Sequence, residues 1–145
     1  MRSKTLTSDP APTLVAILDP GDEAVAQLTA LVRERGLTAA QVTAVGAFAR
    51  ATVGWFDREA KSYRPIRIDE QCEVLSLVGD VALGDDESQL HLHAVLGLSD
   101  GTTRGGHLLE AEVWPTLEVI IRETPAVLRK TDRPELGIAV IDLDR

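Results

Sequence analysis

Hydrophobic and polar positions along the chain predict one amphipathic helix and a series of short strands. Apolar residues recur at helical spacing over residues 22–35, with polar side chains on the other faces and Gly36 as a stop signal. Strand-like apolar or alternating patterns cover residues 13–18, 41–48, 51–56, 63–68, 73–83, 90–98, 116–122 and 137–143. The pattern therefore predicts one main helix and about seven or eight short strands.

The connections between these segments indicate how the strands pair. Most are short and polar, as at residues 57–62 and 99–101, which favours antiparallel neighbours. The segments 41–48 and 51–56 are expected to be adjacent strands joined near Ala49 and Arg50. We expect a single α+β domain over residues 13–145, after a flexible polar lead-in of residues 1–12.

One helix cannot cover both faces of such a sheet. The second apolar face must be closed by curvature of the sheet or by another subunit, because large exposed apolar patches are rare on monomers. The sequence therefore predicts a homo-oligomer as well as an α+β fold.

The net charge of the chain argues against nucleic acid as a partner. The 145 residues carry 15 Lys and Arg against 23 Asp and Glu, a net charge of −8. Basic residues occur only in short pairs and triplets flanked by acids, whereas most non-specific nucleic-acid affinity comes from neutralising phosphates. We therefore expect no DNA binding by the isolated chain.

The single cysteine, Cys72, excludes an internal disulfide framework and a cysteine-rich zinc site. No apolar run approaches the roughly 20 residues of a membrane-spanning helix, and no secretory leader is evident. These features predict a reduced, cytoplasmic setting without a membrane partner.

The three histidines of the chain, His91, His93 and His107, all lie within one short stretch. His91 and His93 are two residues apart on a predicted strand and so project from one sheet face. The turn at residues 99–101 can return His107 beside them. Three imidazoles without a thiolate suit Zn²⁺ or a similar divalent metal and leave one coordination position open. The alternative is that these histidines are structural polar groups at a sheet edge.

Residues near the histidines were weighed in the same way. Gly105 and Gly106 would let the backbone approach closely beside His107. Strand alternation places Glu110 on the opposite face from His107. Asp80 and the acidic loop at residues 85–87 are interpreted as solvated turns, because the spacing of a calcium loop is absent.

The stretch from His91, HLHAVLGLSDGTTRGGHL, resembles the signature of the plants and prokaryotes conserved domain, written PPC or PCC. Further similar pieces are GDE at residues 21–23, VGA at 45–47, EVLSLVG at 73–79 and EVII at 118–121. The resemblance implies a strongly bent, mainly antiparallel sheet and a homotrimer. It also implies a divalent metal, zinc above all, held by His91, His93 and His107, with Glu118 as a nearby carboxylate.

The function implied is that of a small oligomeric domain with a ligand-binding or regulatory role. An open metal position would permit hydrolysis, but no residue pattern specifies a reaction. In plants the family's domain follows AT-hook motifs that bind DNA, and this sequence contains no Gly-Arg-Pro core of such a motif. The alternative is a transcription-associated scaffold that binds protein or DNA and whose histidines are structural.

Overall fold

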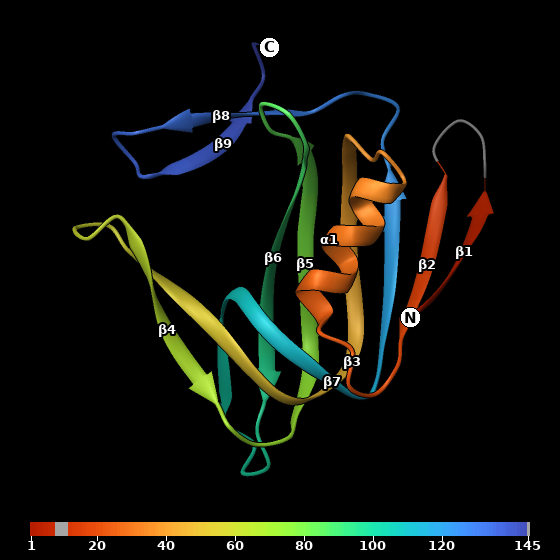
Figure 1. The fold of residues 1–145 in the computed structure, drawn as a ribbon. Helices are drawn as coiled ribbons and strands as arrows, with labels where there is room; N and C mark the ends of the chain where they lie inside the picture. Colours follow the sequence, from red (N-terminus) through yellow and green to blue (C-terminus); the bar gives the residue numbers. More distant parts are fainter. Residues whose placement is uncertain (8–11, 145) are drawn as a thin grey trace.

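The computed structural model describes residues 1–7 and 12–144, with only the backbone given for residues 2–7. Within these ranges the chain forms one helix and nine strands (Figure 1). In chain order they are β1 (Arg2–Thr7), β2 (Thr13–Leu18), α1 (Ala24–Glu34), β3 (Ala39–Asp57), β4 (Ser62–Ile68), β5 (Cys72–Leu83), β6 (Ser88–Gly97), β7 (Thr103–Glu123), β8 (Arg129–Arg133) and β9 (Ile138–Asp142). The predicted α+β class with one helix is confirmed, but there are nine strands rather than the expected seven or eight.

All the strands belong to one sheet, whose centre is the long pair β3 and β7. These two strands run antiparallel from the pair Ala40 and Glu123 to the pair Gly54 and His107. β2 and β1 extend the sheet beyond the second half of β7, and β4 extends it beyond the second half of β3. β5 lies beside the first half of β3, and β6 pairs with both β5 and the first half of β7. Because β6 joins the two halves, the sheet is strongly bent, as expected (Figure 1).

The bend lies where β3 and β7 change register. Gly46 opposes Leu117 but Phe48 opposes Val113, so residues 114–116 bulge opposite a single residue of β3. Pro115 falls in this bulge, where its lack of an amide hydrogen breaks no regular ladder bond. Gly46 has φ +149°, and a Cβ added there would lie 2.2 Å from the Thr116 carbonyl oxygen. Glycine is therefore required at this corner for two independent reasons.

The prediction of two adjacent strands at residues 41–48 and 51–56 is wrong, because both segments belong to β3. The expected turn at Ala49 and Arg50 contains none of the residues that terminate strands, and β7 provides partners on both sides of it. The segment 116–122 is likewise only the second half of β7.

The two ends of the chain also differ from expectation. Residues 2–7, predicted to be part of a flexible lead-in, form β1 and pair with β2, while residues 8–11 lie outside the described residues. Residues 129–133 form β8, which pairs with β9 in a hairpin. The segment RKTDR is polar throughout, so no apolar pattern could indicate that strand.

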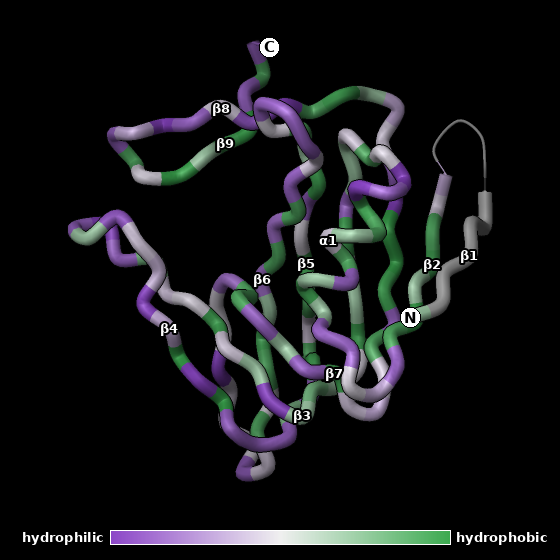
Figure 2. The backbone as a smooth tube through the Cα atoms, viewed as in Figure 1, coloured by the Kyte–Doolittle hydropathy of each residue, from purple (hydrophilic) through white to green (hydrophobic). Residues whose placement is uncertain are grey.

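The predicted helix is confirmed as α1. Glu23 caps its start by accepting hydrogen bonds from the backbone N–H groups of Val25 and Ala26, at 3.3 and 2.6 Å. Gly36, with φ +62°, follows its end. The buried face of the helix packs on β6 and β7 and joins one hydrophobic core. Figure 2 shows hydrophobic stretches in the sheet behind α1 and hydrophilic ones at the turn between β3 and β4.

The sheet face opposite α1 stays open. Residues that directly oppose one another across five strands form a row on this face, from β2 through β7, β3 and β5 to β6. In order they are Val15, Ile120, Thr43, Val78 and His93. Ile120 and Val78 are each 50% exposed, whereas their chain neighbours Val119, Ile121 and Leu77 are buried in the core. The expected uncovered apolar face therefore exists in the monomer, and it ends at the histidines.

Replacement of Gly46 by alanine tests the corner. The new Cβ would collide with backbone atoms of Thr116 and Leu117, so Gly46→Ala should lower the free energy of unfolding by about 3 kcal/mol or more. Gly101→Ala is the matched control, because Gly101 also has a positive φ but open space around it. Denaturant unfolding should show a loss of only about 1 kcal/mol for the control. Equal losses in the two variants would contradict the steric argument.

Candidate metal centre

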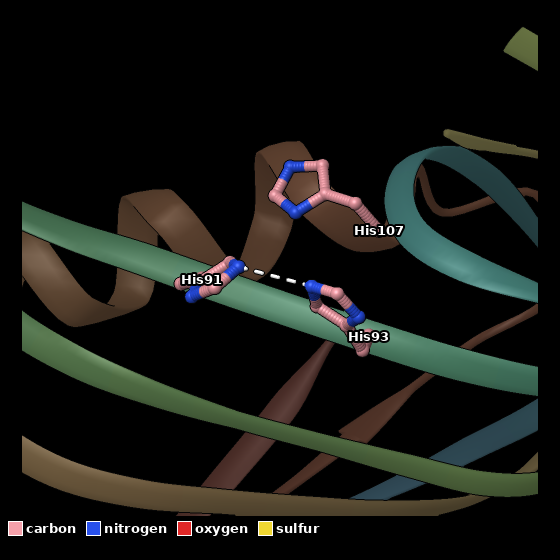
Figure 3. Close-up of side chains that lie close together, drawn as sticks. All are labelled: His91, His93 and His107. Atoms are coloured by element: carbon pink, nitrogen blue, oxygen red, sulfur yellow. Dashed lines mark hydrogen bonds between the residues drawn. The ribbon is translucent and has the colours of Figure 1, made fainter. Parts of the chain in front are cut away.

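The β6–β7 hairpin brings the three histidines together. His91 and His93 lie on the open face of β6, and the turn between Leu98 and Thr102 leads directly into β7. In the hairpin register His107 stands directly opposite His93. The predicted convergence of the three side chains is therefore confirmed, and Figure 3 shows their rings turned toward one another.

The ring nitrogens are close enough to share one ion. One nitrogen from each histidine lies within 4.8 Å of the other two, and His91 Nε2 is 3.1 Å from His93 Nε2. Two ligand nitrogens on a tetrahedral zinc ion stand about 3.4 Å apart, given bonds of about 2.0–2.1 Å. His107 Nδ1 is buried without a hydrogen-bond partner among the described residues, which is the state of a nitrogen that lacks its ligand. The geometry and the donor set both fit a divalent metal.

Glycines let the backbones around His107 approach closely. Gly105 and Gly106 lie within β7, so the expectation that they form a loop is wrong. They still allow the close backbone approach that was expected beside His107. A Cβ on Gly106 would lie 2.5 Å from the Gly54 carbonyl oxygen of β3, and one on Gly105 would lie 3.0 Å from the Ala94 carbonyl oxygen of β6. β7 can therefore fit between β6 and β3 at this point.

An aromatic side chain from β4 supports His107. Tyr63 stacks on the imidazole with ring centroids 4.4 Å apart and planes 16° apart. Gly54, which opposes His107 on β3, leaves the room for this ring, because an added Cβ would lie 2.9 Å from Tyr63 Cδ1. The stack fixes the orientation of His107 from the side away from β6.

The carboxylate beside the histidines is Asp80, which the sequence analysis interpreted as part of a solvated turn. Asp80 lies in β5 directly opposite His91, and its Oδ2 is 3.3 Å from His91 Nδ1. Its Oδ1 is 2.9 Å from Nζ of Lys130, a buried lysine of β8. A hairpin of residues 73–98 around the acidic turn would have predicted that Asp80 lies opposite His91. No feature of the sequence predicted the contact between Lys130 and Asp80.

Glu118 and Glu110 lie outside this cluster. Glu118 is exposed in the second half of β7, opposite Ile17 and Val45, and is not among the groups that converge with the histidines. Glu110 accepts a hydrogen bond from Thr52 Oγ1 at 2.8 Å. A polar depression of about 490 Å³ between Glu110, Arg50 and Arg67 does not include any histidine. Asp80 therefore takes the place that Glu118 was expected to fill.

Burial disfavours the protonated forms of two of the three histidines. Burial, followed by the neighbouring His91, His93 and Lys130, lowers the pKa of His107 to about 4. Burial and His91 also lower the pKa of His93, although Asp80 acts against them. Partial burial would raise the pKa of Asp80, but His91 and Lys130 outweigh it and hold that pKa below its ordinary value. At neutral pH the site therefore combines the unprotonated imidazoles of His93 and His107 with the ionised carboxylate of Asp80.

Comparison with known proteins assigns the family. The family model described as the Plants and Prokaryotes Conserved domain matches residues 7–125. The chain belongs to the PCC domain family. This confirms the resemblance carried by the histidine stretch, and the match ends before β8. A search of curated proteins gave no significant match.

Solved structures of similar proteins share the PCC fold over nearly the whole chain. A metal-containing protein of Archaeoglobus fulgidus is 32% identical, with TM-score 0.81 over 89% of this chain and 91% of its own. A plant- and prokaryote-conserved protein of Pyrococcus horikoshii is 25% identical, with TM-score 0.84 over 97% and 94%. A protein of Bacteroides thetaiotaomicron, for which DNA binding has been suggested, is 25% identical, with TM-score 0.88 over 99% of both chains. The described part of this PCC domain contains no helix long and apolar enough to cross a membrane.

The low pKa of His107 predicts acid sensitivity of the metal-free PCC domain. His107 binds its proton near pH 6.5 when unfolded but only near pH 4 when folded, so the unfolded state gains protons first as pH falls. Stability should be full above pH 6.5 and fall between pH 6.5 and 4. Because His107 is partly exposed, we discount the full linkage value to about 1–2 kcal/mol.

Denaturant unfolding at several pH values in the presence of a chelator measures this loss. In His107→Gln the slope between pH 6.5 and 4 should flatten, because glutamine does not titrate. An unchanged slope would show that other groups carry the pH dependence.

Proposed function

We propose that this PCC domain binds one divalent metal ion, zinc in preference to others, through His91, His93 and His107. Two observations carry the proposal: one nitrogen from each histidine lies within 4.8 Å of the other two, and the buried Nδ1 of His107 has no hydrogen-bond partner among the described residues. A buried polar atom without a partner costs free energy, and a metal ion would satisfy it. The description of the Archaeoglobus fulgidus relative as metal-containing supports the same function.

Three histidine ligands leave one tetrahedral position free for a small ligand. His93 is exposed, so that position can be reached from solvent. A bound zinc ion would supply a Lewis acid there, but the described residues around it include no nucleophile or base in an arrangement that specifies a reaction. We therefore assign the domain a ligand-binding or regulatory role rather than an enzymatic one.

We further propose that the domain is a homotrimer that buries the open sheet face. Val78, Val95, Val45 and Ile120 of this face are each at least 44% exposed, and Trp114 at the bend is 52% exposed. Apolar side chains gathered in this way are typical of subunit interfaces. Because the row ends at His93, the metal centre would lie beside the interface.

The suggested DNA binding of the Bacteroides thetaiotaomicron relative supports a second candidate, a DNA-binding scaffold. The net charge of −8 argues against it for this chain, because an acidic surface repels phosphate.

Metal analysis tests the principal function. The purified protein should hold about one zinc ion per chain, and His93→Ala should lower zinc affinity at least 100-fold in competition with a chromophoric chelator, because one of three ligands is lost. Glu118→Ala, a charge change on the same sheet outside the cluster, should keep the affinity of the parent protein. Unchanged metal content in His93→Ala would refute the ligand assignment.

Light scattering tests the assembly. Three chains of 15.6 kDa should give a particle of about 47 kDa. Ile120→Asp should dissociate it by placing a charge in the apolar interface, whereas Val127→Asp, at an equally exposed valine before β8, should leave it intact. A folded parent protein of 15.6 kDa would contradict the trimer.

Fluorescence anisotropy with a labelled DNA duplex separates the two candidate functions. At physiological salt the isolated domain should bind no duplex at micromolar concentration, because few phosphates can be neutralised. A salt-sensitive submicromolar affinity would favour the DNA-binding scaffold instead.

A further inference from the structure

We propose that Asp80, anchored by Lys130, is a positioning residue that fixes the tautomer of His91 and so prepares Nε2 of this histidine to bind the metal. This inference rests on the proposed metal-binding function and adds to it two residues outside the three-histidine signature. Neither residue binds the metal itself.

The first step is the direction of the hydrogen bond between Asp80 and His91. Asp80 forms an ion pair with Lys130, whose Nζ lies 2.9 Å from Oδ1, so its carboxylate is ionised and can only accept hydrogen bonds. At 3.3 Å from Asp80 Oδ2, His91 Nδ1 must therefore carry the proton. In a neutral imidazole this leaves the lone pair on Nε2, on the side where His93 lies.

The second step is the contact between His91 and His93. Their Nε2 atoms are 3.1 Å apart, a distance that requires one donor and one acceptor. With Nε2 of His91 bare, Nε2–H of His93 must be the donor. His91 is thus ready to bind a metal in the metal-free protein, whereas His93 must move its proton to Nδ1 or release it.

The third step is the anchor of Asp80. Lys130 is 8% exposed, and its Nζ forms an ion pair with Asp80 Oδ1 at 2.9 Å, which leaves Oδ2 for His91. β8 itself is held to the sheet by Leu128, whose carbonyl oxygen accepts from Leu83 N–H at 2.8 Å and whose N–H donates to the Thr38 carbonyl oxygen at 3.3 Å. Lys130 lies beyond residue 125, where the family match ends. The C-terminal hairpin would therefore support a metal centre whose histidines all lie in the part of the chain that the family model matches.

The experiment uses long-range ¹H–¹⁵N correlation spectra of the metal-free, ¹⁵N-labelled full chain at pH 8. These spectra distinguish the two tautomers of each neutral histidine. In the parent protein His91 should be protonated at Nδ1 and His93 at Nε2. A purely structural ion pair between Asp80 and Lys130 would not determine the His91 tautomer.

Two variants and one control complete the test. The double variant Asp80→Ala with Lys130→Met removes both charges together, so that no buried lysine is left unpaired and the fold is retained. It should lose the preference for Nδ1–H at His91 and lower zinc affinity 10–100-fold. Asp80→Asn keeps a hydrogen-bond acceptor, so it should retain the tautomer and lose less affinity. Glu118→Ala should change neither property.

The outcomes separate this proposal from the metal function. A folded double variant with the parent tautomer and the parent zinc affinity would overturn the positioning role, as would an Nε2–H tautomer of His91 in a parent protein that binds zinc. If the parent protein shows Nδ1–H at His91 but binds no zinc, the metal function fails and the positioning of His91 by Asp80 stands.

Discussion

The continuous pairing of β3 with β7 through a shared bend is the constraint on which the rest of the molecule depends. The second half of β7 must oppose Gly46 at Leu117, while its first half must oppose Gly54 at His107. Only a pair of strands that turn together can satisfy both registers and still bring the start of β7 beside β6. The bulge at residues 114–116 and the missing side chain at Gly46 make that turn sterically possible. The histidine cluster is therefore a consequence of backbone geometry far along the same strands.

Burial of His107 both lowers the stability of the metal-free cluster and makes the cluster suitable for a metal ion. The burial that lowers the pKa of His107 disfavours the proton that would compete with a metal, and it also leaves Nδ1 without a hydrogen-bond partner in the described part of the chain. A protein that binds no ion would have to bear an unsatisfied buried atom and two imidazoles, those of His93 and His107, that resist protonation. Such an arrangement would reduce stability without an ion and would be relieved by a bound cation, so the proposed metal binding would be thermodynamically linked to folding.

The sequence predicts the local elements and the signature residues well, because both depend on short-range patterns. Helical spacing ended by Gly36 locates α1, and the His-x-His spacing followed by a tight turn locates the cluster. It fails where long-range pairing decides the structure. Nothing near Arg50 shows that β3 continues beside β7, and the polar segment of β8 gives no sign that Lys130 reaches Asp80. The position of Asp80 beside His91 could have been predicted from the sequence, because a hairpin of β5 and β6 in this register pairs the two residues.

The open sheet face would connect the proposed assembly with the chemistry of the proposed metal centre. Val78 opposes His93 on β5, and Val95 follows it two residues later on β6, so whatever covers these valines also approaches His93. His93 is the most exposed of the three histidines, and its pKa is already lowered by burial within a single chain. A covering subunit would remove more water from this imidazole and disfavour its protonated form further. It would also narrow the approach to the free coordination position, so that the shape of the interface, rather than the three histidines alone, would select the ligand.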